Sequence, residues 1–101
     1  MIDAIEIKIN SGSYNRINAL IDYNNNICYM NNNTYKVDNT LLEELKKILY
    51  TLKKEYGSVN AIDIEEFEII VTNKNHKDRY HGKGIYPNNY TDLINLLERL
   101  K

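Results

Sequence analysis

The sequence is poor in cysteine, proline and glycine, and it lacks long hydrophobic runs. One cysteine, one proline, four glycines and no tryptophan occur in 101 residues. The single Cys28 cannot form an internal disulfide, and residues 1–10 carry acidic side chains where a secretory signal would carry a basic region and an apolar run. No stretch approaches the roughly 18 consecutive apolar residues of a membrane-spanning helix. We therefore expect a cytoplasmic protein.

Neither sign of charge dominates the chain. Thirteen basic and 14 acidic side chains give a formal net charge of −1, so no global field draws the protein toward nucleic acid or anionic lipid. Hydrophobic residues make up 43% and charged residues 27% of the sequence, as in ordinary globular domains and unlike disordered chains. At this length we expect a single domain that spans residues 1–101.

Motifs that would indicate catalysis are missing or poorly placed. Cys28 sits in the apolar stretch ICYM, a setting that raises the pKa of a thiol rather than lowering it. Glu65 and Glu66 are adjacent, so a regular strand would turn them to opposite faces, which is poor geometry for shared acid–base work. The segment HGKG at 81–84 lacks the spacing of a phosphate-binding loop, and glycine inside a strand more often marks a bulge or a close approach. We expect no enzymatic activity and no cofactor.

One set of side chains could hold a metal ion. His76, Asp78 and His81 offer imidazole and carboxylate ligands of the kind that zinc prefers. In a regular strand, residues 76 and 78 share one face while residue 81 points to the other. The three side chains cannot converge without a bulge, so we expect no metal site.

The first third of the chain has the pattern of an antiparallel sheet. Ile5, Ile7 and Ile9 alternate with polar residues, which is typical of a strand with one face in water. A second run, 16–23, alternates in the same way except at Leu20, an apolar residue among the polar positions. Asparagine triplets at 24–26 and 31–33 predict tight turns, because asparagine tolerates left-handed backbone conformations. Four strands in a meander are expected.

Two amphipathic helices follow from apolar stripes at spacings of three and four. The first lies in DNTLLEELKKILYTLKKEYG, with Thr40 and Glu43 as a capping box, Asp38 as an alternative cap and Gly57 as the stop. The second closes the chain in PNNYTDLINLLERLK, with Asn89 at its cap.

Between the helices, strand 62–72 is expected to pair with strand 77–86 in a hairpin whose opposed positions sum to 148 or 149. That register places Glu65 or Glu66 opposite Lys83, and Glu68 near Arg79 and His81, so that an acidic strand meets a basic one. The complete pattern predicts an α+β two-layer sandwich: an antiparallel sheet in the order β-β-β-β-α-β-β-α, with two helices packed on one face.

Residues 76–90 concentrate histidines, basic side chains and tyrosines, and they suggest a recognition role. Tyrosine combines a large contact area with a polar tip, so a tyrosine-bearing open sheet face beside a basic hairpin fits a small interaction protein with a macromolecular, in the first place protein, partner. The residues expected to bind it are Tyr29, Tyr35, Lys77, Arg79, Tyr80, His81, Lys83 and Tyr86. Asn, Ile, Lys and Tyr, the residues with AT-rich codons, make up almost half of the chain. Size and composition fit a phage or mobile-element inhibitor of a host system, such as an anti-CRISPR type protein.

Two other functions remain open. A nucleic-acid-binding module would place Lys74, Lys77, Arg79 and Lys83 on phosphates, with Tyr80 or Tyr86 stacked on bases, although the neighbouring acidic strand would neutralise much of that charge. A homo-oligomeric structural subunit, such as a homodimer, would pair through an edge strand.

Overall fold

Seven strands and two helices form the described part of the chain, which comprises residues 2–12, 14–58 and 64–100 of a computed structural model. In chain order the elements are β1 (Ala4–Ser11), β2 (Tyr14–Asp22), β3 (Ile27–Met30), β4 (Asn33–Lys36), α1 (Asn39–Tyr50), β5 (Glu55–Ser58), β6 (Glu65–Asn73), β7 (His76–Lys83) and α2 (Tyr90–Glu98). The class is therefore α+β, as predicted. Residues 62 and 63, which were expected to begin the strand before the hairpin, lie outside the described residues.

All seven strands join in one mixed sheet with the order β4-β3-β2-β1-β6-β7-β5. The first four strands form the predicted meander, and β1 lies at the centre of the sheet because β6 pairs with its other edge. Every neighbouring pair is antiparallel except β5 and β7, which run parallel. The predictions of a wholly antiparallel sheet and of six strands are thus wrong at β5, a four-residue strand too short for a clear alternating pattern.

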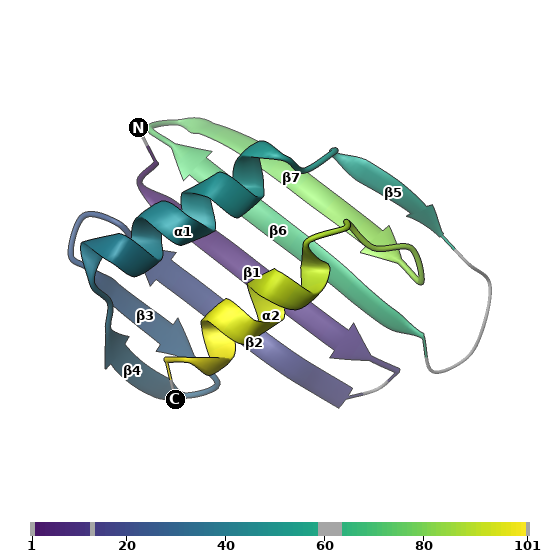
Figure 1. Ribbon diagram of the computed structural model, residues 1–101, viewed down its shortest axis with the longest axis horizontal. Coiled ribbons are helices and arrows are strands. Elements are labelled where there is room, and N and C mark those ends of the chain that lie inside the picture. The colour runs from purple at the N-terminus through teal and green to yellow at the C-terminus, as the bar shows by residue number, and fades with distance from the viewer. Residues whose placement is uncertain (1, 13, 59–63, 101) are drawn as a thin grey trace.

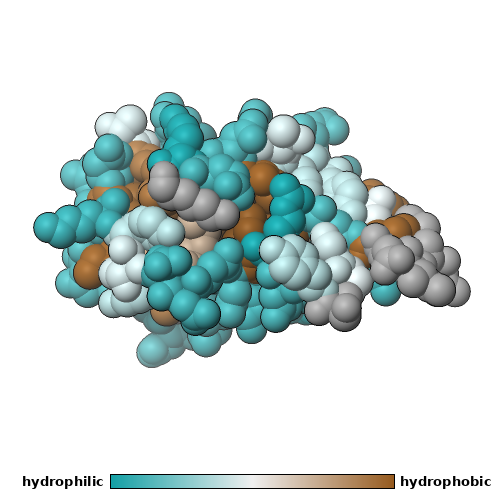
Figure 2. Space-filling model, turned by 90° about the horizontal axis from the view of Figure 1, so that it is seen from below, coloured by the Kyte–Doolittle hydropathy of each residue, from teal (hydrophilic) through white to brown (hydrophobic). Residues whose placement is uncertain are grey.

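Both helices lie on one face of the sheet (Figure 1). The isoleucines of β1 at 5, 7 and 9 are fully buried beneath them, together with Leu45 of α1 and Leu97 of α2. This arrangement follows from the sequence, since alternating strands and striped helices each have one apolar side to bury. Seen from below, polar residues cover most of the surface and hydrophobic residues appear in limited patches (Figure 2). No helix in the described ranges has the length and apolar character needed to cross a membrane.

Asparagines make the tight turns of the meander as predicted. Asn26, Asn31 and Asn32 have φ values of 54°, 49° and 71°, in the left-handed region that asparagine tolerates better than most residues. Asn31 and Asn32 alone separate β3 from β4, so two consecutive left-handed residues connect these strands in a two-residue hairpin.

The helix ends differ in part from the predictions. Asp38, the alternative cap, accepts a hydrogen bond from the Leu41 amide at 2.8 Å and begins α1. Gly57 does not end this helix, which stops at Tyr50; it lies in β5 with φ of +87°. The Asn89 side chain makes no cap bond at the start of α2 and instead donates to the Thr51 hydroxyl at 2.7 Å. The two helices are thereby tied together.

A β-bulge in β2 places a charged side chain where it can form an ion pair with β6. Ile9 pairs with Ile17 and Asn10 with Asn15, so Arg16 is the extra residue on β2. Its guanidinium meets both carboxylate oxygens of Glu65 at 3.0 and 3.1 Å. The Tyr90 hydroxyl also donates to Glu65, at 2.9 Å, and so anchors the first turn of α2 to β6.

Candidate interaction surface

The sheet has a second face, opposite the helices, which no element covers in the described part of the chain (Figure 1). We call it the open face. The strand register aligns its side chains in rows that cross the sheet. One row runs Tyr29, Leu20, Glu6, Ile70, Arg79; the next runs Asn18, Lys8, Glu68, His81, Glu55; a third runs Asn15, Asn10, Glu66, Lys83. Leu20 and Tyr29 thus lie together on β2 and β3, whereas most of the charged groups lie on β6 and β7, where Ile70 is the apolar exception.

The charged half of the open face is the predicted hairpin, except that its second strand ends at Lys83 and not at residue 86. Opposed positions on β6 and β7 sum to 149, with Glu66 opposite Lys83 and Glu68 opposite His81. The Arg79 Nε donates to a carboxylate oxygen of Glu68 at 2.5 Å. The predicted pairing of an acidic strand with a basic one is confirmed, and this pairing takes up part of the basic charge within the protein itself.

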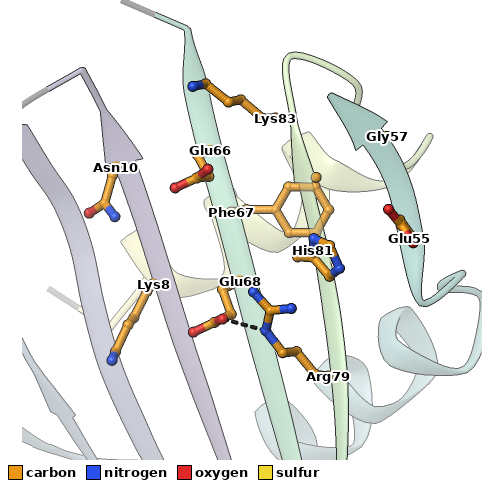
Figure 3. A pocket seen from close by; sticks show the side chains of 11 residues that line it. Lys8, Asn10, Glu55, Gly57, Glu66, Phe67, Glu68, Arg79, His81 and Lys83 are labelled. Atoms are coloured by element: carbon orange, nitrogen blue, oxygen red, sulfur yellow. Dashed lines mark hydrogen bonds and ion pairs between the residues drawn. The ribbon is translucent and has the colours of Figure 1, made fainter. Parts of the chain in front are cut away.

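A cavity of about 230 Å³ lies over this part of the sheet, between β1 and β5 (Figure 3). Its polar lining residues come from four strands and include six charged side chains, Lys8, Glu55, Glu66, Glu68, Arg79 and Lys83, together with His81. Figure 3 shows the Arg79 and Glu68 side chains meeting across β6 and β7, while Lys8 lies over β1. Among the described residues, neither Lys8 nor Lys83 has an ion-pair partner. Positive and negative groups therefore alternate around the cavity.

Gly82 positions β7 beneath this cavity. A Cβ atom at Gly82 would lie 2.7 Å from the Ile85 carbonyl oxygen, 2.8 Å from the Phe67 ring and 2.9 Å from the Tyr56 Cβ. Only glycine permits this approach, so the predicted close contact is confirmed. Phe67 is fully buried, and its ring lies 5.8 Å from that of Tyr56.

The apolar half of the open face centres on Leu20 and Tyr29. These residues are direct partners on β2 and β3 and are 39% and 47% exposed. Leucine and tyrosine side chains that lie side by side on an uncovered sheet favour contact with another molecule, because such contact would remove their apolar area from water. Leu20 was absent from the predicted binding residues, although its departure from the alternating pattern was the available signal.

Three of the predicted tyrosines lie elsewhere. Tyr35 pairs with Cys28 and Tyr80 with Ile69, so both belong to the helix-covered face, where they pack against the core. Tyr86 also packs against the core, and its hydroxyl donates to the Glu65 carbonyl oxygen at 2.7 Å. Burial, with the Glu65 charge adding to it, raises the pKa of Tyr86. The expectation that these tyrosines face outward from the open sheet is wrong.

The remaining predicted residues are divided between the open face and the β6–β7 turn. Arg79, His81 and Lys83 line the cavity, and exposed Lys77 continues the open-face side of β7 opposite Thr72. Lys74, considered for phosphate binding, lies in the turn with φ of 57°.

The possible metal ligands do not converge. His76 Nε2 lies 3.2 Å from an Asp78 carboxylate oxygen, while His81 belongs to the open face. The Lys54 ammonium also reaches Asp78, at 2.9 Å, and this hydrogen bond lowers the pKa of the Asp78 carboxyl. Cys28 is a buried thiol whose pKa burial raises to about 11, so it is a poor nucleophile near neutral pH.

No family model, curated protein or solved structure matches this chain. The geometry of the open face is therefore the basis on which a function can be inferred.

Proposed function

We propose that this is a non-enzymatic interaction protein whose open face binds a protein partner. One observation carries the proposal: the face presents an exposed apolar pair, Leu20 and Tyr29, beside rows of charges of both signs. Protein interfaces commonly combine an aromatic anchor with a polar rim, and tyrosine is enriched among the residues that contribute most to affinity. Tyr29 would be the anchor, and the cavity over β6 and β7 would form the charged rim.

The charge pattern favours protein over nucleic acid. A phosphate backbone requires a surface of one sign, whereas Glu66 and Glu68 stand beside the basic residues of β7. Arg79 is already bound to Glu68, and Lys54 to Asp78. A protein with alternating charges can complement this face group by group, and such complementarity suppresses wrong partners.

The biological setting we propose is inhibition of a host system by a phage or mobile-element protein, for example of the anti-CRISPR type. The support is the small size, the AT-rich residue usage and a surface suited to contact rather than catalysis. Inhibition by occlusion needs only a rigid surface, and a seven-stranded sheet with both helices behind it provides one.

The test begins with affinity capture of a partner from the cells that make the protein, followed by titration calorimetry with the purified partner. Tyr29→Glu should weaken binding about 30-fold, since a central aromatic anchor contributes roughly 2 kcal/mol or more. Tyr50→Glu is the matched control, because Tyr50 is 77% exposed on α1, in the helix layer. Both variants should keep the wild-type melting temperature.

Equal affinity of the two variants would refute the open face as the binding site. Salt-dependent binding of oligonucleotides that disappears in Lys77→Glu/Arg79→Glu would instead support the nucleic-acid alternative, and its absence at low salt would eliminate that alternative.

A further inference from the structure

The two edges of the sheet differ in how well they could accept another strand. At one edge, β5 has an irregular register with β7 and contains Gly57 with a left-handed φ of +87°. At the other edge, all four residues of β4 pair with β3 in unbroken register. Irregular edges resist strand addition, whereas regular exposed edges are templates for it. Within the described residues, no element lies beyond β4 (Figure 1).

The hydrogen-bond register shows which main-chain groups of β4 are free. The Val37 amide donates to the Asn26 carbonyl oxygen at 2.9 Å, so positions 37 and 26 belong to the hydrogen-bonded set. In an antiparallel ladder hydrogen-bonded pairs alternate with non-bonded pairs, which makes Tyr35 with Cys28 a bonded pair. Thr34 and Lys36 fall in the non-bonded set, so their N–H and C=O groups point away from β3, toward the open edge.

We infer that this edge pairs antiparallel with β4 of a second copy of the chain, about a two-fold axis that passes between the two Tyr35 residues. In this register Thr34 of each copy stands opposite Lys36 of the other. Both residues direct their amide and carbonyl groups outward, so the two pairs form four main-chain hydrogen bonds. A closed two-fold contact of this kind uses the same segment on both copies.

The side chains are compatible with this arrangement. Lys36, the only charged residue of β4, faces the neutral Thr34 of the other copy rather than another lysine. The two Tyr35 side chains form the central non-bonded pair, where cross-strand aromatic residues approach closely. Tyr35 is half-buried at present, and pairing would cover more of its ring.

This inference does not depend on the proposed function, because it concerns the sheet edge and not the open face. If both hold, the dimer forms one continuous sheet of fourteen strands, with a Leu20–Tyr29 pair on each side of the two-fold axis. A bivalent open face would then bind a repeated or dimeric partner more tightly than one copy alone.

The test is sedimentation equilibrium of the purified chain over a concentration series from micromolar to millimolar, since a four-residue strand makes a small interface. Wild type and Thr34→Val should both rise from the mass of one chain toward that of two. Thr34→Pro should remain monomeric. Proline removes only the outward amide and is tolerated at an edge strand, so β3 and β4 should stay paired.

Hydrogen exchange supplies a second readout that does not depend on the proline variant folding. The amides of Thr34 and Lys36 should become protected as the wild-type concentration rises, whereas the Tyr35 amide should be protected throughout. A wild-type chain that stays monomeric at millimolar concentration would overturn the inference. So would association that survives Thr34→Pro but is lost in Tyr29→Glu, which would place the contact on the open face.

Discussion

Replacing Gly82 with alanine tests how closely β7 packs under the candidate surface. The added methyl group would meet three atoms at 2.7 to 2.9 Å: a carbonyl oxygen, a buried ring carbon and a Cβ atom. None is the end of a flexible side chain, so the main chain of β7 or of the 84–86 segment must move. Inserting a methyl group into a packed site costs about 1–3 kcal/mol.

A smaller effect acts in the opposite direction. Alanine restricts the unfolded chain more than glycine does, which stabilises the fold by about 0.4–1 kcal/mol. We therefore expect a net loss of about 1.3 kcal/mol in the free energy of unfolding. For a domain of this size, that loss lowers the melting temperature by roughly 5–10 °C. Thermal and urea unfolding followed by circular dichroism would measure both quantities.

The neighbouring substitution His81→Ala is the matched control. It changes the same strand on its open side, where the side chain is partly exposed, and should alter the free energy of unfolding by about 0.5 kcal/mol at most. If Gly82→Ala proved as stable as His81→Ala, the close contact of β7 with Phe67 and Ile85 would be refuted, and with it the position of the cavity floor.

Three further predictions concern groups that hold the fold. Burial lifts the pKa of the Cys28 thiol from 9.0 to about 11, so stability that is fully present below pH 9 should decline by roughly 2 kcal/mol as pH rises through 11; in Cys28→Ala this component of the pH dependence should vanish from urea unfolding curves. Asp38→Ala should destabilise the protein by about 1 kcal/mol and Thr40→Ala by much less, and the reverse order in thermal unfolding would assign the cap to Thr40. In a double-mutant cycle, Arg16→Ala and Glu65→Ala should show a coupling energy of about 1 kcal/mol, and a value near zero would mean that the bulge does not hold the ion pair in solution.

The hairpin of β6 and β7 illustrates what sequence reasoning can reach. Placing the turn at residues 72–77 limited the register to sums of 148 or 149, and the structure has 149, with Glu66 opposite Lys83 and Glu68 opposite His81. Side chains along a strand alternate between the two faces of the sheet, so a slip of one residue in the register would have turned Phe67 and Ile69 out of the core. Burial therefore distinguishes the register with a sum of 149 from the one with a sum of 148, a choice that charge pairing alone left open.

The tyrosines illustrate where the same reasoning failed. Exposure was assigned to Tyr35, Tyr80 and Tyr86 from residue type, whereas side-chain direction follows from parity within each strand. Tyr35 shares its parity with buried Val37, and that comparison would have placed it on the covered face. For Tyr86 no pattern was available, because it lies in an irregular segment between β7 and α2.

The sequence by itself determined the local elements: alternating isoleucines specified strands, leucine stripes specified helices, and asparagine turns specified the meander. These features depend on neighbours along the chain, so each segment carries its own signal. Tertiary structure alone decided that β5 joins the sheet parallel to β7, that Phe67 and Ile85 are the groups that approach Gly82, and that Leu20 stands opposite Tyr29. Those outcomes depend on which distant segments meet in space, and a single sequence contains no local pattern that specifies such a contact.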